Sequence, residues 1–332
     1  MLYRGMDRKQ LDAAYNNTAA VPDRAAIYAD WVARSGAVRR RTISHLDLAY
    51  GEGPRQRLDL FLSGFAKAPT LAFIHGGYWQ MNDKESFSFL AEGPLAHGVN
   101  FAVLEYTLAP AVRLSDIVEE TRLAIQWLAD HLGNYAADGT RLYVSGHSAG
   151  GQLTAMSITL PTVRGGLAIS GIYDLEPIRL NYLNEKLRLD PAEAQRNSPL
   201  FHLPATASEL VIAYGTHELP ELCRQSIDYG RAWNERGLPG RLLPIEEANH
   251  FTILEALARP QGALMGVMLD LMEVRAIERA CLASRSMLNG ADVTVKDRTL
   301  LFHLQFRKLP MAPGIRCRTG LLTPEHIQQR DK

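Results

Sequence analysis

The sequence predicts an α/β fold in which helices cover both faces of a mostly parallel central sheet, with an antiparallel hairpin near its N-terminus. Two observations support this. Short apolar runs, which suit strands buried on both faces of a sheet, alternate along the chain with longer helical segments. This alternation is typical of a parallel sheet with crossover helices. A length of 332 residues, 46% of them apolar, allows a sizeable single core.

The expected strands fall into two groups. Ser44–Tyr50 and Arg57–Leu62 alternate in polarity around a turn signal, which indicates the hairpin. The buried runs follow at Thr70–Ile74, Phe101–Tyr106, Leu142–Ser145, Leu167–Ser170, Leu210–Tyr214 and Gly240–Ile245. Between and after these runs we expect helices at Lys84–His97, Leu114–His131, Ala149–Ser157, Leu219–Arg236 and Phe251–Leu271.

A pentapeptide centred on a serine follows the buried run Leu142–Ser145. Gly146-His-Ser148-Ala-Gly150 stands between an apolar strand and a helical pattern. Glycines on both sides of a serine at a sharp strand-to-helix turn let its Oγ project from the carboxyl edge of the sheet. The positive end of the following helix points at the same place. We therefore expect Ser148 to be a nucleophile.

A pair of glycines follows the first buried strand, in His75-Gly76-Gly77-Tyr78. Their N–H groups, joined by the N–H of Ala149 just after the serine, are placed to stabilise a developing oxyanion. A side chain at Gly76 or Gly77 would block the substrate. The sequence therefore predicts an oxyanion hole built from Gly76, Gly77 and Ala149.

Three larger side chains flank these glycines. We expect His75 to hold the loop through hydrogen bonds rather than to act as a base. Tyr78 and Trp79 are candidate substrate-binding residues that wall an aromatic pocket. Core packing beneath the loop is an equally good interpretation of Trp79.

The serine needs a base, and in a sheet of this kind the chain order is serine, acid, histidine. His250 follows the expected strand Gly240–Ile245 and precedes a helix, so it lies at the same sheet edge as Ser148. His202 and His303 lack that context. His250 is therefore the candidate base.

The acid is expected on the loop after Leu210–Tyr214, where a carboxylate would hold the histidine in the correct tautomer. Glu218 lies on that loop and is favoured over Glu221, which lies inside the next helix. Asp174 ends an earlier strand and is a weaker alternative. His217 is expected to be a bystander.

Together these residues resemble the arylformamidase (kynurenine formamidase-like) branch of the α/β-hydrolases, close to the hormone-sensitive-lipase-type esterases. The resemblance covers about residues 70–255. It rests on His75-Gly-Gly-Tyr-Trp, Gly146-His-Ser-Ala-Gly-Gly, Gly215-x-x-Glu-x-Pro-Glu-Leu-x-Arg-Gln-Ser226 and Asn249-His-Phe251, with Tyr15-Asn16 also similar. It implies a triad of Ser148, Glu218 and His250. Family members often have Asp where this chain has Glu218, and glutamate fills the same role in many relatives.

The implied reaction is hydrolysis of an aryl formamide or amide, such as N-formylkynurenine, through an acyl-enzyme. A carboxylesterase acting on short-chain or aryl esters is the alternative, because it would use the same triad with a roomier acyl pocket. A catalytically silent receptor of the same fold is a third hypothesis. Such proteins usually lose a triad residue or the oxyanion glycines, and this chain keeps both.

Three regions are expected along the chain. Residues 1–40 form a helical segment that covers the site, with Asp7 and Asp23 as candidate helix caps. Residues 41–272 form the catalytic domain. Residues 273–332 form a basic C-terminal extension of unknown role, with 11 Lys and Arg against 6 Asp and Glu. A helix over Glu273–Leu288 and a strand or amphipathic stretch over Thr299–Phe306 fit its pattern.

Composition limits the partners and the setting. Basic and acidic residues number 36 each, which leaves no global positive field for nucleic acid. No apolar run suggests a signal peptide or a membrane span. Cys223, Cys281 and Cys317 form neither a disulfide framework nor a metal-ligand pattern. We expect no metal or cofactor, a small-molecule substrate and a cytoplasmic location. The Met- and Leu-rich Gly262–Met272 is compatible with a homodimer.

Overall fold

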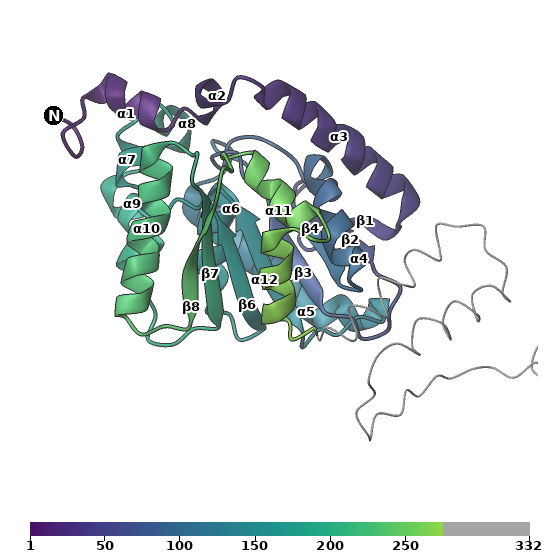
Figure 1. The fold of residues 1–332 in the computed structure, drawn as a ribbon. Coiled ribbons are helices and arrows are strands. Elements are labelled where there is room, and N and C mark those ends of the chain that lie inside the picture. Colours follow the sequence, from purple (N-terminus) through teal and green to yellow (C-terminus); the bar gives the residue numbers. More distant parts are fainter. Residues whose placement is uncertain (275–332) are drawn as a thin grey trace, which may run out of the picture. The chain divides into compact units, whose positions relative to one another are not determined.

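An eight-stranded sheet organises the computed structural model, which describes residues 1–274 (Figure 1). The strands lie in the order β1-β2-β4-β3-β5-β6-β7-β8. Their bounds are β1 Ile43–Ala49, β2 Arg57–Leu62, β3 Thr70–Ile74, β4 Asn100–Leu104, β5 Leu142–His147, β6 Val163–Ile169, β7 Glu209–Gly215 and β8 Gly240–Ile245. The six strands from β3 to β8 pair in parallel, and the β1–β2 hairpin joins β4 antiparallel. The predicted mostly parallel sheet with an antiparallel hairpin is confirmed.

Helices lie on both faces of this sheet, with α12 in front of it and α6 behind it in Figure 1. The α-helices are α1 Arg8–Ala14, α2 Asn17–Ala20, α3 Arg24–Arg41, α4 Glu92–Ala96, α5 Leu114–His131, α6 Ala149–Ser157, α7 Glu176–Arg179, α8 Asn184–Leu187, α9 Pro191–Arg196, α10 Pro220–Glu235, α11 Glu255–Ala258 and α12 Ala263–Leu271. Short 3₁₀ helices occur at η1 Glu85–Ala91, η2 Leu132–Tyr135, η3 Pro199–Phe201 and η4 Thr252–Leu254. The bounds expected for α5 and α6 are confirmed.

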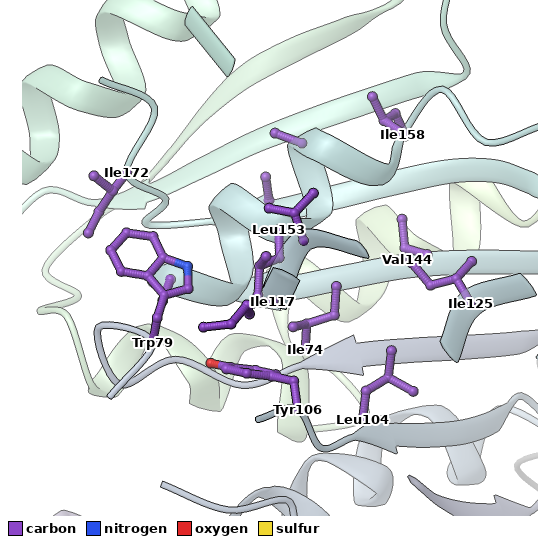
Figure 2. Packing of buried hydrophobic residues seen from close by; sticks show 14 of the residues in the cluster. Ile74, Trp79, Leu104, Tyr106, Ile117, Ile125, Val144, Leu153, Ile158 and Ile172 are labelled. Carbon is purple, nitrogen blue, oxygen red and sulfur yellow. The ribbon is translucent and has the colours of Figure 1, made fainter. Parts of the chain in front are cut away.

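Alternate side chains of each strand feed two separate hydrophobic cores, because successive residues of a strand point to opposite faces. Ala72 and Ile74 of β3 join the core that contains α5, α6 and α10. Leu71 and Phe73 join the core that contains α3, η1, α11 and α12. Figure 2 shows part of the first core, where Ile74 lies with side chains of α5, β5 and α6.

Two expected helices are interrupted. The segment predicted as a helix over Lys84–His97 is a 3₁₀ turn followed by the short α4. Ser35 of α3 explains this, since its Oγ accepts the N–H of Phe89 and donates to the carbonyl of Ser86. The helix predicted over Phe251–Leu271 is η4, α11 and α12, because Pro260 follows α11 and cannot continue a helix.

The connection between β6 and β7 contains four short helices that the sequence did not indicate, namely α7, α8, α9 and η3. Each spans three to six residues, which is shorter than the window in which helical periodicity can be recognised. The connection reaches the N-terminal segment through the Tyr182 N–H, which donates to Asp12.

Residues 1–40 pack with residues 41–272 in the same compact unit. Asp7 caps α1 as expected, whereas the predicted cap Asp23 makes no side-chain cap hydrogen bond. The fully buried Asp59 of β2 holds α3 to the sheet, because it pairs with Arg39 and lies 3.1 Å from Lys84 Nζ.

Within residues 1–274, no helix is both long enough and apolar enough to cross a membrane. The expected helix over Glu273–Leu288 and the stretch Thr299–Phe306 lie outside the described residues, apart from Glu273 and Val274.

Candidate active site

Ser148 lies on a tight turn between β5 and α6. Its backbone has φ 58° and ψ −117°, a conformation that non-glycine residues rarely adopt. The flanking glycines are required by close packing. A Cβ at Gly146 would lie 2.2 Å from the Gly150 carbonyl oxygen, and one at Gly150 would lie 1.9 Å from the Ile74 carbonyl oxygen. The strained serine is therefore held by a turn that is packed against β3.

His250 follows β8 and contacts Glu218, which follows β7. The Nδ1 of His250 lies 2.7 Å from Oε2 of Glu218, and both side chains are buried. Because Nδ1 donates its proton to the carboxylate, Nε2 is left as an acceptor, which is the tautomer that a general base needs. Ser148 and His250 line the same cavity.

The second oxygen of Glu218 is also engaged. Its Oε1 accepts hydrogen bonds of 2.6 Å from Ser170 Oγ and 2.6 Å from the Gly215 N–H. These bonds hold the carboxylate oxygen that His250 does not contact. Sequence reasoning missed Ser170, although it directly follows β6 at the same sheet edge as the other candidate residues.

The rejected alternatives for the acid and base lie elsewhere. Glu221 binds Arg224 through a two-point ion pair, and Asp174 accepts a hydrogen bond of 2.8 Å from Tyr3 Oη. His217 and His202 are exposed. His303 lies outside the described residues.

The loop after β3 approaches the serine closely. A Cβ on Gly76 would lie 3.0 Å from Ser148 Cβ, so a side chain at this position would press on Ser148. Gly77 has φ 119°, and a Cβ there would lie 2.3 Å from the Met81 carbonyl oxygen. The N–H of Ala149 lies in the first turn of α6, where helix geometry provides no partner for N–H groups.

His75 holds this loop in the manner expected of a structural residue. It is fully buried, stacks on Tyr106, and places Nε2 3.1 Å from Glu105. Burial by itself raises the pKa of Glu105, but the hydrogen bond and charge of His75 and the Arg55 guanidinium outweigh it and lower this pKa. Glu105 is therefore the ionised anchor of the loop.

Tyr78 and Trp79 both have positive φ and point to different places. Tyr78 lines the cavity, and its Oη donates to the Tyr15 carbonyl at 2.7 Å and accepts from Asn17 at 3.0 Å. Trp79 is fully buried in the core, where Nε1 donates to Gln152 (Figure 2). It is not among the cavity-lining residues, so the structure places the indole in the packing role rather than in the pocket wall.

His147, inside the serine pentapeptide, is another residue that sequence reasoning missed. Burial and the neighbouring His250 hold its pKa well below the ordinary value, so the ring is neutral. Its Nε2 therefore donates to the His250 carbonyl oxygen at 2.7 Å. This bond ties the turn that carries Ser148 to the loop that carries the candidate base.

The cavity at this site has two walls. The sheet edge contributes the Gly76–Tyr78 loop, Met81, Asn82, Phe87, His147, Ser148, His250 and Phe251. The N-terminal segment contributes Asn17, Thr18, Arg24, Tyr28 and Trp31. Within residues 1–274, no cluster of three or more His, Cys, Asp or Glu side chains suits a metal ion.

Comparison with known proteins places this geometry in a family. Residues 58–165 match the BD-FAE family model. A kynurenine formamidase from Salmo salar is 31% identical over 72% of this chain and 86% of its own length. One from Danio rerio is 29% identical over 81% of this chain and 98% of its own. The chain belongs to the kynurenine formamidase family.

Solved structures agree with membership of this family of α/β-hydrolases. A candidate thioesterase from Silicibacter sp. tm1040 has a TM-score of 0.71 and 32% identity, over 78% of this chain and 98% of that one. Carboxyl esterase 2 from Tuber melanosporum has a TM-score of 0.59 at 21% identity, over 70% of this chain and 87% of that one, a likeness of fold.

Proposed function

We propose that this kynurenine formamidase family member is a serine hydrolase whose triad is Ser148, His250 and Glu218. The observation that carries the proposal is the His250–Glu218 hydrogen bond beside a strained serine that lines the same cavity. A base with its tautomer fixed, in the same cavity as a serine on a sharp turn, is the arrangement that acyl transfer requires.

In the first step, Ser148 Oγ attacks the substrate carbonyl while His250 Nε2 takes its proton. The N–H groups of Gly76, Gly77 and Ala149 form the oxyanion hole and stabilise the charge of the tetrahedral intermediate. His250 then protonates the leaving amine. Water repeats the sequence on the acyl-enzyme and releases the acid.

The substrate class is an aryl formamide or amide of the N-formylkynurenine kind. Membership of the kynurenine formamidase family supports this choice, as do the aromatic side chains that line the cavity. A formyl group needs little room on the acyl side. The alternative is a carboxylesterase for short-chain or aryl esters, which the likeness to esterases supports.

Three further expectations belong to this proposal. Residues 1–40 cover the site, residues 41–272 carry the chemistry, and the extension from residue 273 is basic. A cytoplasmic location fits the absence of a disulfide framework in the cysteine spacing. A homodimer remains compatible with the apolar Gly262–Met272 segment.

The decisive experiment compares purified wild type with Ser148→Ala on N-formylkynurenine and on p-nitrophenyl acetate. We expect wild type to favour the formamide in kcat/KM, and the variant to lose nearly all turnover of both. Labelling of Ser148 by a fluorophosphonate provides an independent readout. Near-normal activity of Ser148→Ala would refute the nucleophile, and ester turnover without formamide turnover would favour the carboxylesterase.

A further inference from the structure

The carbonyl oxygen of Gly76, in the loop after β3, accepts two hydrogen bonds from side chains. His75 Nδ1 donates to it at 2.8 Å, and Asn82 Nδ2 donates to it at 3.1 Å. Because a carbonyl oxygen only accepts, these contacts also decide which atoms of the imidazole and of the amide carry hydrogen. The two donors together use both lone pairs of the oxygen.

The carbonyl of Gly76 and the N–H of Gly77 belong to one peptide unit. Because this unit is planar and trans, the two groups point in opposite directions. Within residues 1–274, no protein group accepts the N–H of Gly77. The unit begins at the Cα of Gly76, where an added Cβ would lie 3.0 Å from Ser148 Cβ. The bonds to the carbonyl thus decide where a free N–H points beside Ser148.

Asn82 is suited to hold this carbonyl. Its backbone has φ 79°, in the left-handed region that asparagine tolerates better than most residues. Its amide lies close to Gly77, where an added Cβ would come within 2.8 Å of Asn82 Nδ2. The backbone carbonyl of Asn82 in turn accepts from Arg55 Nη2 at 2.7 Å. Asn82 is therefore fixed through its backbone while its side chain fixes the neighbouring peptide.

Arg55, in the turn between β1 and β2, supports the second donor as well. It pairs with Glu105, and Glu105 lies 3.1 Å from His75 Nε2. Two routes thus lead from one guanidinium to one carbonyl oxygen. Asn82 lines the cavity, whereas His75 is fully buried in the loop support. Asn82 can therefore be changed while the His75–Glu105 contact stays in place.

We propose that Asn82 is a positioning residue that orients the Gly77 N–H toward the oxyanion formed at Ser148. This inference rests on the proposed function, because it takes that N–H as a donor of the oxyanion hole. Asn82 acts through the peptide between Gly76 and Gly77. Its effect is largest when the substrate carbonyl oxygen becomes charged, since the hole stabilises the tetrahedral intermediate more than the planar substrate. Loss of Asn82 should therefore lower kcat rather than raise KM.

Two variants remove the donor in different ways. Asn82→Asp keeps the shape of the side chain but replaces the amide N–H groups by an acceptor. Asn82→Gly removes the side chain, adds no charge and is unstrained at φ 79°. A loss that both variants share therefore reports the missing donor rather than the added charge or the freer backbone. Asn134→Asp is the matched control, because this exposed asparagine lies in η2, before the amino end of β5 and so at the opposite edge of the sheet.

Three measurements separate orientation from binding. Steady-state kinetics on N-formylkynurenine and p-nitrophenyl acetate gives kcat and KM. A fluorophosphonate gives the rate at which Ser148 is labelled. Inhibition constants are compared for trifluoroacetophenone and acetophenone. Ser148 Oγ adds to the carbonyl carbon of the trifluoromethyl ketone, its proton passes to His250, and the carbonyl oxygen becomes an oxyanion in the hole. Acetophenone is not activated for this addition and stays planar. Thermal melts check that each variant is folded.

We expect both Asn82 variants to lose about tenfold or more in kcat on whichever of the two substrates wild type cleaves, and a similar factor in labelling rate, with KM changed by less than about threefold. Inhibition by trifluoroacetophenone should weaken about tenfold, and inhibition by acetophenone should not change. Asn134→Asp should behave as wild type. Wild-type kcat in both Asn82 variants, or equal weakening for the two ketones, would overturn the inference alone. A wild type that the fluorophosphonate does not label would refute the proposed function and this inference with it.

Discussion

Glu218 binds the imidazole of His250 at 2.7 Å, whereas Glu221, three residues further along the chain, is occupied by Arg224. Two glutamates of the same chemistry thus stand in one short segment with different partners. The difference arises because Glu218 precedes α10, on the loop at the sheet edge, and Glu221 lies inside the first turn of this helix.

This pair provides a prediction with an internal control. Glu218→Gln should lower kcat by about 10³-fold or more, because an amide no longer holds the imidazole as the required tautomer or stabilises the imidazolium. Glu221→Gln should leave kcat within about threefold of wild type. Steady-state kinetics of both variants on one substrate measures the effect. Equal losses of kcat in the two variants would show that Glu218 is not the acid of the triad.

Ser170→Ala tests the support of the carboxylate. Removing the hydroxyl leaves Glu218 Oε1 with the Gly215 N–H alone. A hydrogen bond to a charged group contributes about 1.5–3 kcal/mol, so we expect kcat to fall by roughly 10- to 100-fold while KM changes little. The variant's thermal melt serves as the control for folding, and an unchanged kcat would contradict the role.

Tyr78→Phe tests how the N-terminal segment is attached. The phenol donates to the Tyr15 carbonyl and accepts from Asn17, and both bonds are lost in the variant. We expect faster hydrogen exchange over residues 15–31, measured by mass spectrometry. Tyr182→Phe is the matched control, since its hydroxyl lies 3.5 Å from the same carbonyl and contributes a weaker contact. Identical exchange in the two variants would contradict this assignment.

Two glycines with opposite surroundings predict opposite effects on stability. A Cβ at Gly150 would collide with the backbone of β3, so Gly150→Ala should destabilise the fold severely. A Cβ at Gly266, inside α12, would meet nothing within 4 Å. Gly266→Ala should therefore stabilise the protein by about 0.5–1 kcal/mol through helix propensity. Urea unfolding of both variants checks the two signs.

His147 predicts a pH dependence of stability. Burial keeps its folded-state pKa well below the ordinary value of 6.5, so below about pH 6.5 the unfolded chain binds a proton that the folded chain does not. The free energy of unfolding should therefore fall on acidification from pH 7.5 to pH 5.5, because the unfolded chain takes up this proton and the folded chain does not. His147→Gln should remove this part of the slope, and the exposed His202→Gln should not. Denaturation curves at the two pH values measure it.

The sequence predicted the sheet well because buried strands have a local signature. The runs at Thr70–Ile74 and Gly240–Ile245 have the predicted bounds, since apolar residues there are bounded by turn signals. The breaks at η1 and at Pro260 show what local patterns omit. The Phe89 N–H donates to the hydroxyl of Ser35, fifty-four residues earlier, and this bond cannot be recognised from the residues around Phe89.

The candidate site was predictable where motif and strand order coincide, as at Ser148, Glu218 and His250. Residues that act through these three were missed. Ser170 and His147 are identified by the partners they contact, and those partners come from other strands. The position of Trp79 could not be decided either. Tyr78 and Trp79 both have positive φ, and the spacing of residues in the sequence does not encode where side chains on such a backbone point.

The N-terminal segment has a consequence for synthesis of the chain. Arg24, Tyr28 and Trp31 are made before all strands of the sheet, yet Trp31 packs against Phe251 and Arg34 binds Glu255. These contacts span more than 200 residues of sequence. A nascent chain therefore holds one wall of its cavity without the other until the strand before His250 has left the ribosome. During that interval, the aromatic face of α3 lacks its packing partners, and shielding it from neighbouring chains prevents aggregation.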